Sequence, residues 1–153
     1  SSQKLIFTTN GFAKQLINEN VQPARAQVLI TKPIENLDIK GTFHLDCGYY
    51  YFRNIDNRIL LGGGRHLDIK TETTTKLAQT EKIQQSLENL LKYTILPERD
   101  YEIDHRWSGI MGVGSQKKPI VKQLSHPAYC RVRMGGMGFA LGSLIGKEVS
   151  DFF

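Results

Sequence analysis

Near its carboxy end the chain reads YCRVRMGGMGF, from Tyr129 to Phe139. Residues from Tyr129 to Met134 alternate in character along the chain, which predicts a β-strand, and Gly135–Gly138 predicts a tight loop. A helix is expected from Phe139 onward. Its apolar positions recur at helical spacing and would form one buried stripe made of Leu141, Ile145, Val149 and Phe152.

A strand, a glycine loop and a helix in this order allow two interpretations. The glycines would let backbone amides approach a ligand, and the amino-terminus of a helix presents unpaired N–H groups with partial positive charge. Alternatively, the glycines only form a turn that lets the helix pack on the sheet. The loop is not a dinucleotide-binding fingerprint, because no third glycine follows Gly136 and Gly138 at the required position.

The remaining patterns predict an α+β fold with a mixed, largely antiparallel sheet and flanking helices. Tyr49–Arg53 and Arg58–Leu61 form the clearest predicted hairpin, joined by the turn residues Asn54–Asn57. An amphipathic helix is expected in the segment that ends at Pro97, with Ile83, Leu87, Leu90 and Leu91 on its apolar face. Further strands are expected at Lys4–Thr9, Ala26–Thr31, Thr42–Leu45 and Tyr101–Trp107.

Composition restricts the classes of function. The 153 residues carry a formal charge of +5, but the basic residues are scattered, so a solvated surface is preferred over a nucleic-acid site. No apolar run is long enough to span a bilayer, and neither a secretion signal nor a membrane partner is expected. Cys47 and Cys130 are interpreted as buried thiols of a reducing compartment, which favours the cytoplasm. No metal site is predicted, because the four histidines lack ligand spacing.

The tyrosine-rich strand supplies a second candidate site. If the strand begins at Tyr49, then Tyr49, Tyr51 and Arg53 share one face. Two phenols and a guanidinium on one face could bind a carboxylate-bearing substrate. A sheet face covered by large amphipathic side chains is the commoner explanation of such a pattern.

Four stretches together resemble the flavin-dependent oxidoreductases related to D-amino-acid oxidase, glycine oxidase and sarcosine oxidase, in the order that this family places them. They cover nearly the whole chain and are Thr8–Phe12 with Val21–Leu29, Tyr49–Arg53 with Arg58–Arg65, Arg106–Gly112 with Pro119–Val121, and Met134–Ala140. The resemblance implies two pieces of a Rossmann-like FAD domain, residues 1–21 and 128–153, on either side of a substrate-binding domain, residues 22–127. It also implies that the amino-terminal half that grips the flavin is absent.

The resemblance further implies oxidation of a C–N bond in a small amine or amino acid, with FAD as cofactor. No cysteine lies in Trp107–Gly114, where sarcosine oxidases attach flavin, so non-covalent FAD is expected. An arginine expected near Met111 in D-amino-acid oxidases is missing, so that strict assignment is not made. The chain alone should be inactive, and its partner would be the missing half of the parent chain. The alternative is a non-catalytic binding or regulatory module.

The same resemblance assigns the site residues, without naming any catalytic residue. Backbone N–H groups of the glycine loop would face the flavin where negative charge develops, and a side chain at Gly138 would clash with it. The cofactor-binding candidates are Gly135, Gly136, Met137, Gly138 and Phe139. The substrate-binding candidates are Tyr49, Tyr51 and Arg53.

Overall fold

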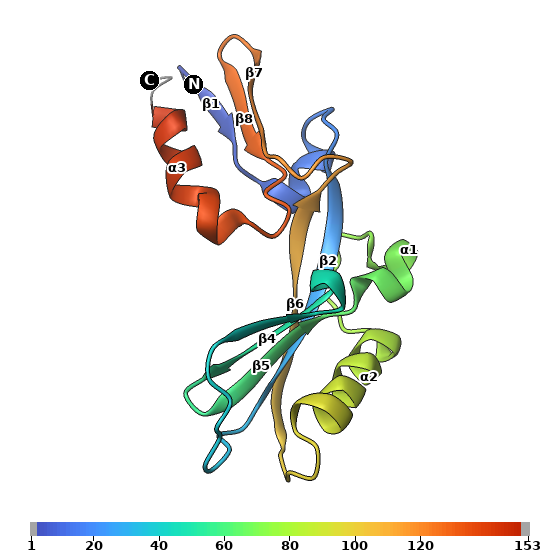
Figure 1. Ribbon diagram of the computed structural model, residues 1–153. Helices are drawn as coiled ribbons and strands as arrows, with labels where there is room; N and C mark the ends of the chain where they lie inside the picture. The colour runs from blue at the N-terminus through green and yellow to red at the C-terminus, as the bar shows by residue number, and fades with distance from the viewer. Residues whose placement is uncertain (1–2, 151–153) are drawn as a thin grey trace. The chain divides into compact units, whose positions relative to one another are not determined.

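The computed structural model describes residues 3–150 and contains two β-sheets flanked by helices (Figure 1). The strands are β1 (Leu5–Phe7), β2 (Gln22–Thr31), β3 (Thr42–Leu45), β4 (Tyr50–Ile55), β5 (Arg58–Gly63), β6 (Ile103–Val113), β7 (Ile120–Ser125) and β8 (Ala128–Val132). The α-helices are α1 (Ile69–Glu72), α2 (Glu81–Leu90) and α3 (Gly138–Ser150). Short 3₁₀ segments are η1 (Asn10–Gln15), η2 (Asp46–Gly48) and η3 (Arg65–Asp68), and η4 (Leu91–Ile95) is a π-helical turn.

The chain divides into two compact units. The first unit contains residues 1–24, 73–75 and 110–153, and the second contains residues 25–72 and 76–109. The expected cofactor and substrate domains had boundaries at residues 21/22 and 127/128. Which unit binds cofactor and which binds substrate stays a prediction.

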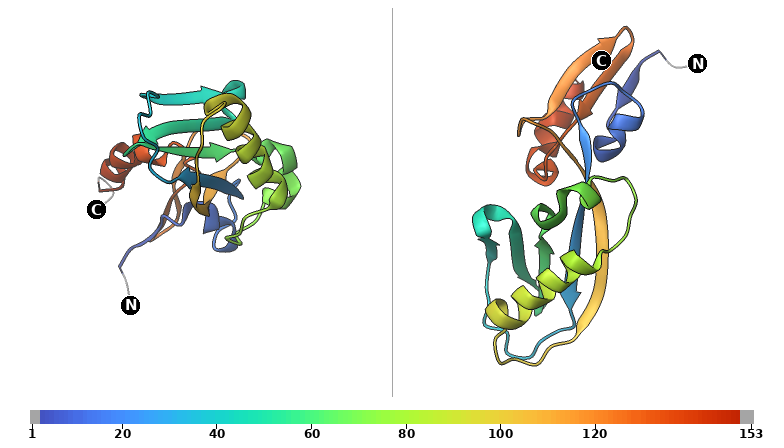
Figure 2. Two further views of the ribbon diagram at one scale, coloured as in Figure 1. Left: turned by 90° about the horizontal axis from the view of Figure 1, so that it is seen from below. Right: turned by 90° about the vertical axis from the view of Figure 1, so that its right-hand side faces the viewer.

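The second unit is built around a sheet with strand order β3-β4-β5-β2-β6. Pairing of β3 with β4, of β4 with β5 and of β5 with β2 is antiparallel. Helix α2 covers one face of this sheet, as two views show (Figures 1 and 2). The apolar core lies between them, and its fully buried members include Leu29, Ile59, Leu61, Ile83, Leu87 and Leu91.

The β4–β5 hairpin is confirmed, and its turn is tighter than expected. Asp56 and Asn57 both have positive φ, at 53° and 57°, which Asp and Asn tolerate better than other non-glycine residues. The turn therefore has two residues, and β4 extends to Ile55. Gly63 and Gly64, with φ of 127° and 78°, end β5 in a conformation that favours glycine.

Helix α2 forms in the segment where the spacing of apolar residues predicted a helix. Ile83 and Leu87 are buried against the sheet, and the helical path continues through η4 to Ile95, before Pro97. Thr80 occupies the N-cap position, but its hydroxyl does not cap the helix. That hydroxyl donates instead to the Glu72 carboxylate, so the start of α2 is tied to the end of α1.

The first unit contains the sheet β1-β8-β7, in which β1 pairs parallel with β8 and β7 pairs antiparallel with it. The strand, glycine loop and helix expected near the carboxy end are present as β8, residues 133–137 and α3. Ile145 of α3 is buried, as expected. Phe152, expected on the same stripe, lies outside the described residues.

The α+β class is confirmed, whereas several boundaries differ from the expectation. The expected loop at 108–118 is largely the end of β6, which continues to Val113. Strand β7 and the short helical segments η3 and α1 were not predicted, because apolar and polar residues do not alternate in a clear pattern within them. Cys47 is exposed rather than buried, while Cys130 is buried, and both are free thiols.

Candidate functional sites

The glycine loop before α3 is held by the first unit. The N–H of Gly135 donates to the Gly112 carbonyl at 2.9 Å, and the N–H of Met137 donates to the Met134 carbonyl at 2.8 Å. The side-chain oxygen of Asn10 accepts from the N–H of Met134 at 3.0 Å. These bonds fix the loop, so two of the five predicted cofactor-binding residues have already used their backbone donors.

The remaining donors of this loop are available. Within residues 3–150 the backbone N–H groups of Gly136, Gly138, Phe139 and Ala140 have no hydrogen-bond partner. Three of them belong to the first turn of α3, a helix of 13 residues, so the positive end of the helix dipole adds to them. Ala140 was not predicted, although the helix start expected at Phe139 would have indicated it.

The backbone conformation requires glycine at some positions of this loop but not at all of them. Gly135 and Gly136 have φ of 56° and 87°, which accounts for both. Gly138 has no such φ, and the nearest atom to an added Cβ is Met134 Cβ at 3.6 Å, an ordinary contact. A side chain at Gly138 would therefore find room within this chain, and the clash expected with a bound flavin stays a prediction.

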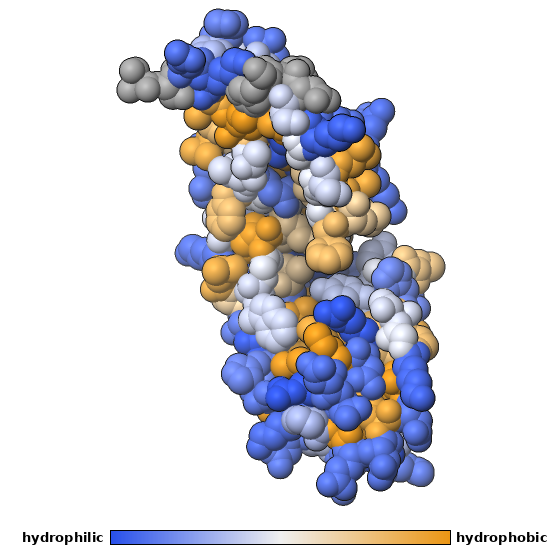
Figure 3. All heavy atoms as spheres, turned by 90° about the vertical axis from the view of Figure 1, so that its left-hand side faces the viewer, coloured by the Kyte–Doolittle hydropathy of each residue, from blue (hydrophilic) through white to orange (hydrophobic). Residues whose placement is uncertain are grey.

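Helix α3 also leaves one side uncovered. Added Cβ atoms at Gly142 and Gly146 would meet nothing within 4 Å. The side chain of Phe139 is fully exposed, and Leu144 is 57% exposed. Figure 3, which views the side on which α3 lies in Figure 1, shows hydrophobic surface interrupted by hydrophilic groups.

The tyrosine-rich segment differs from the expected alternation. Strand β4 begins at Tyr50, so Tyr49 precedes it, and its ring contacts His66 in a tilted arrangement with ring centroids 4.1 Å apart. Tyr51 and Arg53 share the face of β4 that points away from α2, whereas Tyr50 points toward α2 and its hydroxyl bonds Ser86. The structure thus keeps two of the three predicted substrate-binding residues on one sheet face.

Strand register identifies the neighbours of Tyr51 and Arg53. Directly paired residues of antiparallel strands point to the same face, so each forms a row across four strands. The rows are His44–Tyr51–Gly62–Val28 and Thr42–Arg53–Leu60–Ile30. The face therefore combines an aliphatic centre with an exposed guanidinium and a half-buried phenol.

A buried ion pair in the second unit was missed by sequence reasoning. Arg25 and Glu72 are 5% and 1% exposed and pair at 2.8 and 2.9 Å through two guanidinium nitrogens. Thr80 Oγ1 donates to the same carboxylate at 2.9 Å, and Arg25 also donates to the Lys76 carbonyl at 3.3 Å. Neither residue stood out, because Arg25 lies in a stretch that supported only the family resemblance and Glu72 lies in a polar segment without a recognisable motif.

The pair continues into a chain of hydrogen bonds that reaches α2. Gln27 donates to Thr80 Oγ1 at 2.7 Å and accepts from the side chain of Gln84 at 3.1 Å. Arg106 donates to Gln84 Oε1 at 2.7 Å and pairs with Glu88 at 2.8 Å. We call the six residues Arg25, Gln27, Glu72, Thr80, Gln84 and Arg106 the polar network.

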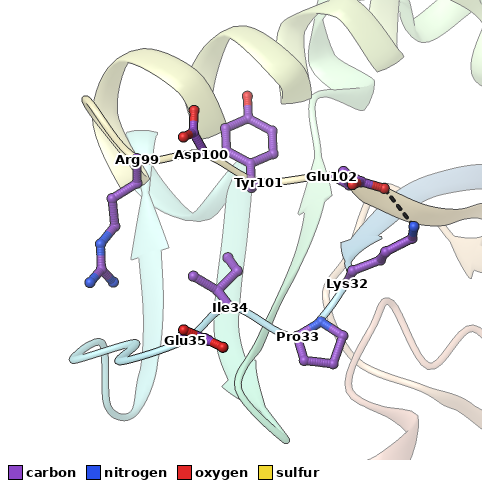
Figure 4. Close-up of a pocket in the computed structure, with 8 residues that line it drawn as sticks. All are labelled: Lys32, Pro33, Ile34, Glu35, Arg99, Asp100, Tyr101 and Glu102. Atoms are coloured by element: carbon purple, nitrogen blue, oxygen red, sulfur yellow. Dashed lines mark hydrogen bonds and ion pairs between the residues drawn. The ribbon is translucent and has the colours of Figure 1, made fainter.

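One hollow in the second unit coincides with neither predicted site. It is an open cavity of about 400 Å³ formed by residues 32–35 and 99–102 (Figure 4). Lys32 pairs with Glu102 at its rim, and Arg99 donates to the Asn36 carbonyl at 2.8 Å. Figure 4 shows the Arg99 side chain directed away from Tyr101. Both basic residues of the hollow are thus bonded to other residues of the chain.

Neither a membrane span nor a metal site is found in the described part of the chain. None of its helices combines the length and hydropathy needed to cross a bilayer. Among residues 3–150 no three His, Cys, Asp or Glu side chains come together as metal ligands would.

Comparison with known proteins places this geometry in a family. Residues 1–152 match the family model DAO, described as FAD dependent oxidoreductase. Comparison with curated protein sequences gives no match.

Solved structures share the fold at low identity. Glycine oxidase from Bacillus cereus ATCC 14579 superposes with a TM-score of 0.78 at 15% identity, over 99% of this chain and 43% of that one. Iminodiacetate oxidase from Chelativorans sp. BNC1 gives 0.74 at 16% identity, over 96% and 41%. L-Proline dehydrogenase from P. horikoshii gives 0.72 at 17% identity, over 97% and 42%.

The chain thus spans about two fifths of the length of the structures that it matches. The match to the family model extends over nearly every residue, from the first strand through α3. This chain belongs to the DAO family of FAD-dependent oxidoreductases.

Proposed function

We propose that this chain is the carboxy-terminal portion of a flavin-dependent oxidoreductase that oxidises a C–N bond of a small amine or amino acid. The free donors at the start of α3 are the observation that carries the proposal. Three N–H groups in the first turn of α3, and a fourth at Gly136 in the loop before it, have no hydrogen-bond partner among residues 3–150. A helix amino-terminus with free donors binds groups that are negative or become so during a reaction.

Non-covalent FAD fits this turn. Gly138 offers its N–H without a side chain of its own, and the N–H groups of Phe139 and Ala140 follow it in the same turn of α3. A bound flavin would accept a hydride from the carbon next to the substrate nitrogen. The residues of the turn would stabilise the negative charge that reduction brings, and Gly136 would add a further donor from the loop.

The sheet face with Tyr51 and Arg53 is the proposed substrate wall. The guanidinium of Arg53 is exposed and can grip both oxygens of a carboxylate, while Leu60 and Ile30 beside it exclude water from an aliphatic portion. Tyr49 stays a candidate only at the margin of this face, because it precedes the strand and its ring contacts His66. No general base is assigned.

A second, flavin-binding half of the protein would be needed to complete the site. The related structures are more than twice as long as the matched region. A flavin-binding half with a phosphate-binding turn would complete the site, and the chain alone would be inactive. Free thiols at Cys47 and Cys130 support a reducing, cytoplasmic location.

The test is the colour of two samples. The natural gene product that contains residues 1–153 should be purified without denaturation and its visible spectrum recorded, and the isolated chain should be mixed with FAD and gel-filtered. We expect flavin absorbance in the natural product and no stoichiometric flavin on the isolated chain. A colourless natural product would contradict the oxidoreductase and leave a non-catalytic binding module. Stoichiometric flavin on the isolated chain would contradict the need for a second half.

A further inference from the structure

The glycine loop before α3 is attached to two other segments of the first unit. The side-chain oxygen of Asn10 accepts from the Met134 N–H at 3.0 Å, across 124 positions of sequence. Beside this bond, the N–H of Gly135 donates to the Gly112 carbonyl at 2.9 Å. The start of the loop is therefore bonded both to the segment that follows β1 and to the end of β6.

Two glycines let these segments lie against each other. A Cβ added at Gly112 would lie 2.5 Å from the side-chain oxygen of Asn10. A Cβ added at Gly11 would lie 2.8 Å from the Met111 carbonyl oxygen. Both glycines are buried, and neither has a positive φ. Close packing, and not backbone conformation, therefore requires glycine at both positions, and it holds Asn10 against the end of β6.

Asn10 has the backbone conformation and the acceptor that this position needs. Its φ is 42°, a left-handed value that asparagine adopts more readily than most residues. The bond to Met134 also determines which end of the side-chain amide faces the loop, because only the amide oxygen accepts from an N–H. Glycine would adopt the same φ without the acceptor, whereas aspartate would supply both.

The loop needs such a fixed point because its own residues restrict it little. Gly135 and Gly136 have φ of 56° and 87° and no side chains that could pack. The N–H groups of Gly136 and Gly138, shortly after Met134, have no partner among residues 3–150. Donors of this kind stabilise a developing charge only when their positions are fixed before the reaction.

We propose that Asn10 is a positioning residue: it fixes the peptide at Met134, so that the free N–H groups of Gly136 and Gly138 keep the positions in which they donate to a bound group. The identification of that group as flavin rests on the proposed function. Asn10 acts only through the loop.

Hydrogen exchange of the natural full-length protein tests the attachment. Asn10→Gly removes the acceptor and keeps a residue that adopts positive φ, so the fold should persist. The Met134 amide should then exchange about tenfold faster, as followed by mass spectrometry of peptides from residues 129–139. Asn10→Asp keeps an acceptor oxygen and should retain the slow exchange. An unchanged exchange rate in Asn10→Gly would overturn the proposal.

Asn36→Gly is the matched control for these variants. Asn36 is an exposed asparagine of the second unit with φ of 50°, so its replacement makes the same chemical change in a similar backbone conformation. It should leave the exchange of the Met134 amide as in the wild type. Equal acceleration by Asn36→Gly and Asn10→Gly would mean that the loop responds to general destabilisation, and the proposal would fail.

The midpoint potential of the bound flavin separates positioning from a purely structural role. If the loop donors stabilise the negative charge that reduction brings, then donors out of position favour the oxidised form. In Asn10→Gly the potential should fall by about 30 mV, which is a tenfold change in a two-electron equilibrium. Asn36→Gly should leave it unchanged. Faster exchange at an unchanged potential would overturn the positioning role and leave Asn10 a residue of the fold.

Asn10→Asp gives the answer if Asn10→Gly does not fold. It keeps the bond to Met134 and adds a negative charge beside the loop, so it should also lower the flavin potential, whereas Asn36→Asp should not. The same potential in Asn10→Asp and the wild type would contradict the proposal. A colourless natural product would contradict the proposed function instead, and exchange of the Met134 amide would still confirm or overturn the attachment.

Discussion

The polar network and the turn at the start of α3 use hydrogen-bonding groups in opposite ways. In the polar network Arg25 and Thr80 both donate to the Glu72 carboxylate, and burial leaves Arg25 and Glu72 little contact with solvent. At the turn, the N–H groups of Gly138 and Phe139 have no partner among residues 3–150, and the side chain of Phe139 is fully exposed. The polar network thus makes its hydrogen bonds within the chain, whereas the turn has donors that no described residue of the chain accepts.

This difference distinguishes groups that hold the fold from groups available for a ligand. A buried polar group without a partner costs about 1–3 kcal/mol, so networks inside a domain are closed. Free donors at an exposed helix terminus cost little while water covers them, and they become useful when a ligand displaces that water. Two neighbouring residues of β4 show the same contrast, because the Tyr50 hydroxyl bonds Ser86 and the Tyr51 hydroxyl has no partner among residues 3–150.

Breaking the network should have the largest effect on stability. Glu72→Ala leaves the Arg25 guanidinium buried without its carboxylate and removes the acceptor of Thr80. The free energy of unfolding should fall by about 3–5 kcal/mol, measured by urea denaturation. Glu98→Ala, an exposed carboxylate elsewhere in the same unit, is the control and should change it little. A loss below 1 kcal/mol for Glu72→Ala would mean that the pair does not hold the fold.

Lowering the pH should remove part of the stability that the Glu72 carboxylate contributes. Burial acts to raise the pKa of Glu72, but the hydrogen bonds to its carboxylate outweigh burial and hold this pKa below its ordinary value of 4.5. The stability from Glu72 is therefore present above pH 4.5 and is lost as the pH falls through the lowered value. The difference in urea midpoint between wild type and Glu72→Gln should shrink below that pH. A difference that is constant with pH would exclude an ionised Glu72.

On the proposed substrate wall, Arg53→Lys should act on binding. Lysine keeps the charge but loses the paired donors, so in the natural enzyme KM for an amino acid should rise about tenfold while kcat changes less. Arg65→Lys is the matched control and should leave KM unchanged. If KM rises in the Arg65 variant instead, the carboxylate is held there and not at Arg53.

The smallest effect is expected on the open side of α3. Gly142→Ala should stabilise the isolated chain by up to about 1 kcal/mol, because alanine favours helix and nothing lies within 4 Å of the added Cβ. Gly48→Ala is the contrast, since its surroundings are equally open but its φ of 87° should make alanine unfavourable. Thermal melts of both variants measure this. A destabilised Gly142→Ala would show that this glycine is needed by the chain's own fold.

Local patterns predicted the elements better than the sites. The hairpin, α2 and the strand–loop–helix at Tyr129–Phe139 follow from period, turn residues and glycine, which act within a few residues. The sequence predicted that strand β4 begins at Tyr49, one residue too early, because three consecutive tyrosines give no sign of where the strand starts. Tyr49 was therefore assigned to the strand, although it precedes it. The Arg25–Glu72 pair joins residues 47 apart, and no local pattern encodes such a contact.

The glycine loop shows the same limit at the level of single atoms. Sequence identified the turn, but which N–H groups stay free depends on Gly112 and Asn10, which lie far away along the chain. The N–H of Gly135 is used by the Gly112 carbonyl, and that of Met137 by the Met134 carbonyl, whereas the N–H of Ala140, which the sequence did not single out, has no partner among residues 3–150. Similarly, the sequence indicated only that Gly62 lies at a strand end. Glycine is needed there because the Tyr51 ring occupies the space that a Cβ would take.

Gly138→Val in the natural full-length protein is the most direct test of whether the free donors serve a flavin. Flavin content, flavin reduction rate and melting temperature should be measured on the same preparation. Because the nearest atom to an added Cβ within this chain is 3.6 Å away, we expect the fold to persist. Flavin should bind more weakly or be reduced about 100-fold more slowly, as for loss of one donor to a developing negative charge. A variant that melts early yet binds flavin fully and reduces it at the normal rate would contradict this and leave Gly138 a residue of the turn alone.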